Sequence, residues 1–209
     1  KYFWESNISL DTPVEKIQEE QIAFSSEIEV MGLAGLTVMG HLFIRKEGVS
    51  LKYQMLDSHD IQFAWNSLTS IEYKPLTQTL KLSLESTTIT LRGNEAQLLY
   101  HIFEIFRQGD TFVDGIWSGK WLTKNHSGSG YIFLGNNALY FIPCGLPSSL
   151  SSKPIQSVQC SEIQYFTLKK KDIILITSDA KRWDITVNIP DVWLGHHQRL
   201  LLELWSRNS

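Results

Sequence analysis

The residues whose types and spacing most clearly suggest ligand binding are lysines and arginines in the second half of the chain. Positive side chains at close range bind phosphate and other anionic groups. The candidates are Lys120, Lys124, Lys169, Lys170, Lys171, Lys181 and Arg182. We expect them to contact anionic lipid headgroups, with each lysine near such a surface contributing on the order of 1 kcal/mol. The alternative for Lys169–Lys171 is a solvated hairpin turn.

Two other clusters have residue types that occur in catalytic or metal sites. Asp57-Ser58-His59-Asp60 contains the residues of a hydrolytic triad, but these residues are adjacent, whereas triad groups converge from separate elements. We interpret the cluster as a solvated loop between strands. His196-His197 lacks the i, i+4 spacing that places two histidines on one helix face, so a structural or surface role is expected. The sequence therefore predicts no enzyme, no metal site and no cofactor.

Composition limits the classes of partner. The chain has 209 residues and a formal net charge of −3, which argues against nucleic acid as a partner. Hydrophobic residues make up 43% and charged residues 20%, as in an ordinary globular protein. The two cysteines, Cys144 and Cys160, are too few for a disulfide framework, which favours a reducing, cytoplasmic compartment and at most peripheral membrane association.

A repeat divides the chain. Gly40–Leu51 can be aligned with Gly130–Phe141 at an offset of 90 residues, with matching glycine, phenylalanine and aliphatic positions. A second match, Ile71–Tyr73 with Ile163–Tyr165, has an offset of 92. A period of this length indicates duplicated domains rather than a solenoid. We expect a linker over residues 1–21, a first domain over 22–108 and a second over 115–206.

The elements expected in each copy are short strands followed by one helix. Alternating apolar and polar residues predict half-buried strands, whereas apolar residues at helical spacing predict an amphipathic helix. The first copy opens with residues 22–30, in which apolar and polar residues are mixed. Strands are expected over 36–44, 49–55, 79–85 and 88–91, and a helix over 95–106. In the second, strands are expected over 115–123, 131–134, 139–142, 159–168, 172–177 and 183–187, and a helix over 192–205.

These residues carry a family resemblance. The segment Gly130–Phe141 resembles the hairpin of GRAM domains, which are pleckstrin-homology-like (PH-like) modules, and Gly40–Tyr53 is a weaker version of the same pattern. Leu68–Ile71 and Ser161–Ile163 resemble a later strand of that family. The resemblance implies a mainly β fold of two PH-like barrels in tandem, each capped by a C-terminal α-helix.

The resemblance also implies a binding function. Family members often bind phosphoinositides or other membrane lipids, and others are protein-interaction modules. PH-type lipid sites place basic residues on the first two strands and the loop between them. This pattern is absent from the first copy, where Leu33–Met39 has no basic residue, and only half present in the second. We expect a non-enzymatic, membrane-associated adaptor that contacts anionic lipid or a membrane protein. The alternatives are a purely protein-interacting module and an accessory domain of an enzyme.

Overall fold

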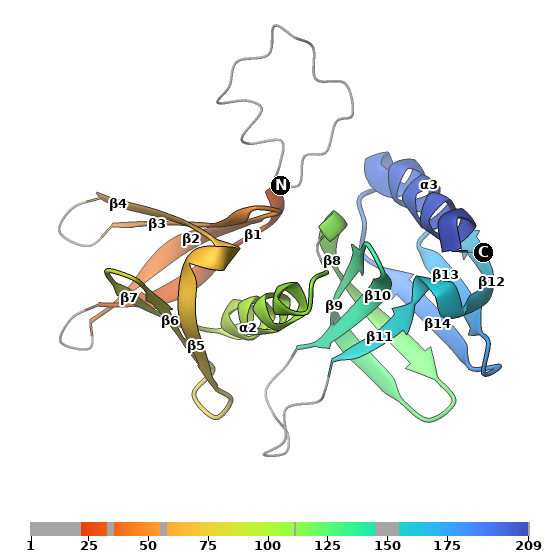
Figure 1. The fold of residues 1–209 in the computed structure, drawn as a ribbon, viewed down its shortest axis with the longest axis horizontal. Coiled ribbons are helices and arrows are strands. Elements are labelled where there is room, and N and C mark those ends of the chain that lie inside the picture. The colour runs from red at the N-terminus through yellow and green to blue at the C-terminus, as the bar shows by residue number, and fades with distance from the viewer. Residues whose placement is uncertain (1–21, 33–35, 55–57, 111, 145–154, 209) are drawn as a thin grey trace, which may run out of the picture. The chain divides into compact units, whose positions relative to one another are not determined.

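The computed structural model describes residues 22–32, 36–54, 58–110, 112–144 and 155–208 (Figure 1). This part of the chain is mainly β and divides into two compact units, with the boundary between Gly109 and Asp110. We call them unit 1 and unit 2. The expected linker over residues 1–21 lies outside the described residues.

Unit 1 is a seven-stranded antiparallel sheet followed by a helix. The sheet order is β4-β3-β2-β1-β7-β6-β5. A short 3-10 helix, η2 (Trp65–Ser67), precedes β5, and α2 (Asn94–Arg107) follows β7. The strands are β1 (Ile22–Met31), β2 (Thr37–Arg45), β3 (Gly48–Gln54), β4 (Ser58–Ala64), β5 (Leu68–Lys74), β6 (Thr79–Leu84) and β7 (Thr88–Arg92).

Unit 2 has the same topology. Its order is β11-β10-β9-β8-β14-β13-β12, which is the order of unit 1 with seven added to each strand number. The short helix η3 (Cys160–Glu162) precedes β12, and α3 (Asp191–Asn208) follows β14. The strands are β8 (Phe112–Thr123), β9 (Ser127–Gly135), β10 (Ala138–Pro143), β11 (Gln156–Gln159), β12 (Ile163–Lys169), β13 (Asp172–Thr177) and β14 (Arg182–Val187).

The register of the central hairpins agrees with the main repeat alignment. Gly40 pairs with Tyr53 in unit 1, and Gly130 pairs with Pro143 in unit 2. Both residues of the second pair are 90 positions after those of the first. The alignment of Gly40–Leu51 with Gly130–Phe141 therefore joins structurally equivalent strands.

The second repeat match was three residues out of register. Leu68 and Ile163 each begin the strand that follows the short helix, and each precedes a register shift in the pairing with the next strand. The equivalent residues in this region are thus 95 apart, not 92. Ile71 and Ile163 were matched because apolar residues recur along both strands, so several alignments satisfy the same pattern.

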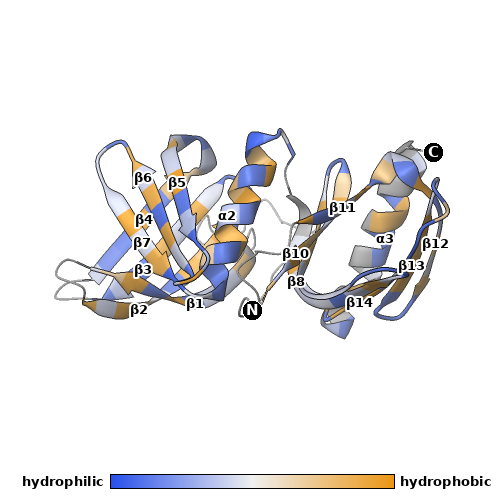
Figure 2. Cartoon of the chain, turned by 90° about the horizontal axis from the view of Figure 1, so that it is seen from below, coloured by the Kyte–Doolittle hydropathy of each residue, from blue (hydrophilic) through white to orange (hydrophobic). Residues whose placement is uncertain are grey.

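The cores follow the alternation of the strands (Figure 2). In unit 1, Leu80 and Leu82 of β6 are buried, whereas Lys81 between them is exposed. Helix α2 packs against β1, β5, β6 and β7, with Leu98 and Ile102 fully buried. In unit 2, α3 contacts η3 and β8, and Leu201 is buried.

Two expectations about the strands were wrong. Ser58, His59 and Asp60 belong to β4 at the sheet edge, not to a loop; Asp57 lies outside the described residues. The strand expected over 159–168 is interrupted by η3, so it forms parts of β11 and β12. Edge strands with polar residues on both faces lack the alternation by which strands are recognised.

Candidate functional site

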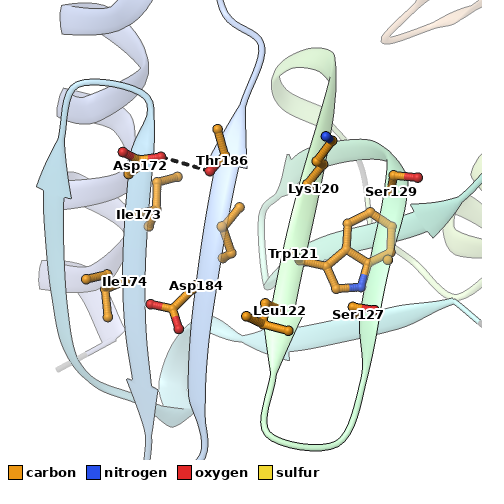
Figure 3. Close-up of a pocket in the computed structure, with 12 residues that line it drawn as sticks. Lys120, Trp121, Leu122, Ser127, Ser129, Asp172, Ile173, Ile174, Asp184 and Thr186 are labelled. Atoms are coloured by element: carbon orange, nitrogen blue, oxygen red, sulfur yellow. Dashed lines mark hydrogen bonds between the residues drawn. The ribbon is translucent and has the colours of Figure 1, made fainter.

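The candidate site is a shallow depression of about 760 Å³ on the outer face of the unit 2 sheet (Figure 3). The outer face is the one whose side chains point away from the buried core. Along β8, Lys120 and Leu122 project to this face, whereas Trp121 between them is buried. The twelve lining residues are Lys120, Trp121, Leu122, Ser127, Gly128, Ser129, Asp172, Ile173, Ile174, Asp184, Ile185 and Thr186.

The strand register places a row of polar side chains across this depression. Lys120 of β8 pairs with Thr186 of β14, and Thr186 pairs in turn with Asp172 of β13. Asp172 pairs with Lys169 at the end of β12. Because directly paired residues of antiparallel strands project to the same face, all four side chains share the outer face.

A second basic position lies at the other end of the same strands. Arg182 pairs with Ile176 on β13, four residues after Asp172, and the turn carrying Lys124 follows Thr123 on the neighbouring strand β8. Four residues of antiparallel strand span about 14 Å. The outer face therefore has basic side chains at both ends of a strip about 14 Å long, rather than in one tight cluster.

Several of the predicted basic residues already have partners. The Arg182 guanidinium donates hydrogen bonds to the Asp184 carboxylate at 2.7–3.1 Å, and this carboxylate raises the pKa of Arg182. Lys171 forms an ion pair with Asp191 at 3.1 Å. The Lys181 ammonium lies 4.4 Å from the ring centroid of Trp183.

Five predicted residues have no ion pair within the described part of the chain: Lys120, Lys124, Lys169, Lys170 and Lys181, the last of which lies over the Trp183 ring. The first three lie on the outer face or in the turn at its end. The nearby Asp172 carboxylate accepts a hydrogen bond from the Thr186 hydroxyl at 2.8 Å. After internal pairing, the outer face therefore retains an excess of positive charge.

The two halves of the sequence differ in charge. Residues 110–209 contain ten Lys and Arg against eight Asp and Glu, whereas residues 1–109 contain nine against fourteen. The overall charge of −3 therefore belongs to the first half, and the half that contains the depression is slightly basic. This separation makes a local electrostatic contact compatible with an acidic protein.

Aromatic packing behind the depression fixes the strands that carry it. Phe141 contacts the rings of Trp121 and Trp183, with centroids 5.4 and 4.9 Å away. The Trp121 indole N–H donates to the Gln156 amide oxygen at 3.0 Å. The same indole covers Gly128, where an added Cβ would lie 2.5 Å from the ring. Glycine at 128 thus allows the close approach of β8 and β9.

Asp110 anchors the hairpin between β9 and β10. This buried carboxylate accepts hydrogen bonds from the backbone N–H of Asn136 at 2.8 Å and the hydroxyl of Tyr140 at 2.7 Å. Burial, together with the Asp110 charge, raises the pKa values of Tyr140 and Cys160. Both groups are therefore neutral at physiological pH, and the arrangement is structural.

His59 and Asp60, two residues of the cluster that resembled a hydrolytic triad, both contact residues of β3. The His59 ring stacks on Tyr53 at 4.9 Å, and Asp60 pairs with Lys52 at 3.7 Å, so the two side chains are engaged with β3. The side chains of His196 and His197 lie outside the described residues. In the described part of the chain, no three His, Cys, Asp or Glu side chains gather as a metal site would require. The described helices also include none with the length and apolar character needed to cross a membrane.

The sequence interpretation missed the acidic members of the site. Asp172 and Asp184 were not singled out, although they alternate with buried residues on strands that had been recognised. The alternation in 172–177 and 182–187 already places both on the face opposite the core. The sequence does not show that β8 pairs with β14, and this pairing brings together residues that are about 60 positions apart in the chain.

Comparisons with known proteins do not assign this chain to a family. No protein family and no curated protein matches the sequence. One solved structure that resembles this chain is the crystal structure of the C-terminal domain of an unknown protein from Leishmania infantum. It has a TM-score of 0.38 and 17% sequence identity, covering 54% of this chain and 98% of that one.

Proposed function

We propose that this chain is a non-enzymatic binding module that associates with anionic membrane surfaces through the outer face of unit 2. The observation that carries the proposal is the placement of Lys120, Lys124 and Lys169 on or beside one face, with no ion pair in the described residues. Each lysine near an anionic bilayer contributes on the order of 1 kcal/mol. A cytoplasmic location, with peripheral membrane association, goes with this proposal.

The spacing of the basic residues favours a surface over a single headgroup. A clamp around one phosphate requires several donors within hydrogen-bonding distance. Here the basic positions are spread over about 14 Å of strand, and Arg182 is engaged by Asp184. A bilayer presents many separate headgroups, so such spacing suits it.

We further propose that both units are PH-like barrels of the GRAM type, each closed by the helix that follows its last strand. Seven antiparallel strands followed by one helix, in the same order twice, support this assignment. Lys120 and Lys124 lie on the first strand of unit 2 and in the loop after it, where the family places lipid-binding residues.

A protein partner is the second candidate, and one observation favours it. The depression contains Leu122, which is 53% exposed, and Ile174 beside the carboxylate of Asp184. A mixed apolar and charged hollow is typical of protein interfaces. On this alternative, the chain is a scaffold that does not bind lipid.

Vesicle co-sedimentation of the full chain tests the proposal. The variant carries Lys120→Gln, Lys124→Gln and Lys169→Gln, and the control carries Lys46→Gln, Lys74→Gln and Lys81→Gln in unit 1, with the same change in net charge. Binding to phosphatidylcholine vesicles containing phosphatidylserine should fall roughly 100-fold at low salt for the unit 2 variant only.

A third variant tests the turn of unit 2. Replacing Lys169, Lys170 and Lys171 by glutamine should reduce binding less, because Lys171 is already paired with Asp191. Equal binding by the unit 2 variant and the parent, or no vesicle binding by the parent at low salt, would refute the membrane proposal and leave the protein-interaction alternative.

A further inference from the structure

One carboxylate on the outer face of unit 2 lies among lysines without forming an ion pair. Asp172 of β13 pairs with Lys169 of β12 and with Thr186 of β14. Beyond Thr186, the next residue in the row is Lys120 of β8. Asp172 is exposed and lines the depression, as Figure 3 shows, and no ion pair in the described part of the chain includes it. From Lys120 to Lys169, the charges of the row are thus positive, negative and positive.

The other acidic side chain of the depression is already neutralised. The Asp184 carboxylate accepts hydrogen bonds from the Arg182 guanidinium at 2.7–3.1 Å. Asp172 has a neutral partner instead, because its Oδ1 atom accepts a hydrogen bond from the Thr186 hydroxyl at 2.8 Å. This bond orients the carboxylate but does not compensate its charge. Among the residues that the structure describes, Asp172 is therefore the acidic group of the depression whose charge is available to a ligand.

The Asp172 charge makes this face selective among anionic surfaces. Neighbouring strands lie about 4.8 Å apart, well within a Debye length of about 10 Å, so the carboxylate repels the phosphates that the lysines attract. It contributes favourably only where the ligand also has a cation. A primary ammonium has three N–H donors for a carboxylate, whereas the quaternary ammonium of choline has none. The complementary ligand is a phosphate with a primary ammonium close to it.

We propose that Asp172 accepts hydrogen bonds from the primary ammonium of an aminophospholipid headgroup, while Lys169 and Lys120 contact phosphates beside it. The inference rests on the proposed membrane function and names the class of lipid that this face prefers. Lys169 is one strand from Asp172, near enough for the phosphate of the same headgroup, and Lys120 is two strands away, where a neighbouring headgroup lies. Phosphatidylethanolamine and phosphatidylserine both have this chemistry.

Two pairs of vesicles with matched net charge test the proposal with the full chain. The first pair contains the same fraction of phosphatidylglycerol in phosphatidylethanolamine or in phosphatidylcholine. The second contains equal fractions of phosphatidylserine or phosphatidylglycerol in phosphatidylcholine. In co-sedimentation at low salt, the parent should bind the amine-containing member of each pair roughly threefold more tightly, the scale expected for one exposed ion pair.

Two variants assign the preference to Asp172. Asp172→Asn removes the charge but retains an oxygen that can accept the Thr186 hydrogen bond, so it should abolish both preferences while binding to phosphatidylglycerol vesicles is maintained or increased. Glu85→Gln makes the same change in net charge at an exposed residue between β6 and β7 of unit 1, and it should retain both preferences. Urea unfolding checks that both variants fold as the parent does.

Several results would overturn the inference. Equal binding of the parent within each pair would refute ammonium recognition, and salt-dependent binding to phosphatidylglycerol vesicles would leave the proposed function standing. A preference that Asp172→Asn retains would assign the selectivity to lipid packing or to another side chain. A preference in one pair alone would also contradict it, because both headgroups contain the primary ammonium. Absence of binding to every vesicle would refute the proposed function together with the inference.

Discussion

Acidification should destabilise unit 1 through His101 on α2. This side chain is 7% exposed, and its Nε2 atom has no hydrogen-bond partner in the described residues. Burial lowers its pKa from 6.5 to about 4. The imidazole is therefore neutral in the folded protein at pH 5 but mostly protonated in the unfolded chain. Because the unfolded state binds the additional proton, stability falls as the pH drops below 6.5.

The magnitude follows from the two pKa values. The full difference of about 2.5 pH units corresponds to about 3 kcal/mol, reached below pH 4. Between pH 7 and pH 5, the loss of unfolding free energy attributable to His101 should be about 2 kcal/mol. Urea unfolding at both pH values, followed by circular dichroism, measures it. The curve is fitted with two transitions because the chain has two units.

Two variants separate His101 from other titrating groups. His101→Leu should reduce the stability change between pH 7 and pH 5 by about 2 kcal/mol, and the transition that it alters is that of unit 1. His41→Leu is the matched control, because it replaces a histidine that is exposed on β2 rather than buried in the core of unit 1. An equal pH dependence in the parent and in His101→Leu would show that the imidazole is hydrated in the folded state, contrary to this reasoning.

Two further predictions concern unit 2, both measured by urea unfolding. Leu201→Ala should cost about 2–5 kcal/mol because Leu201 is buried on α3, and a cost below about 1 kcal/mol would contradict packing of this face in the core. Asp110→Ala should cost about 1–3 kcal/mol, since it leaves the amide of Asn136 without this acceptor, and Tyr140→Phe should cost less because the carboxylate remains. Equal costs for the last two variants would argue against the role of Asp110 in the hairpin.

Much of the fold could be predicted because hydrophobic alternation is a local signal. The strand over 172–177 was predicted with the bounds that the structure has, and both helices were predicted to within three residues at each end. The edge strand β4 was missed because the burial pattern of Ser58–Ala64 is exposed or half-exposed at all positions but Phe63. An edge strand has fewer neighbours, so its sequence is less constrained.

The candidate site was less predictable than the fold, since its geometry depends on long-range pairing. The sequence identified the basic residues but not which of them share a face. Lys120 and Lys169 are 49 positions apart and are brought onto one row by β14 and β13, which lie between their strands. Arg182 was predicted to be available to a ligand, and its engagement by Asp184 depends on the i, i+2 spacing that a strand imposes.

The two units share one topology but differ in charge. Core residues of both sheets are constrained by packing. Leu42 and Ile132 are equivalent in the repeat and are both buried, at 0% and 1% exposed. Turn residues bury little and are free to change. On the proposed function, the basic residues on the outer face and first turn of unit 2 supply the contact with the membrane. The equivalent connection in unit 1 has no charged residue between Val30 and Gly40, so the duplicated topology does not by itself give both units the same binding chemistry.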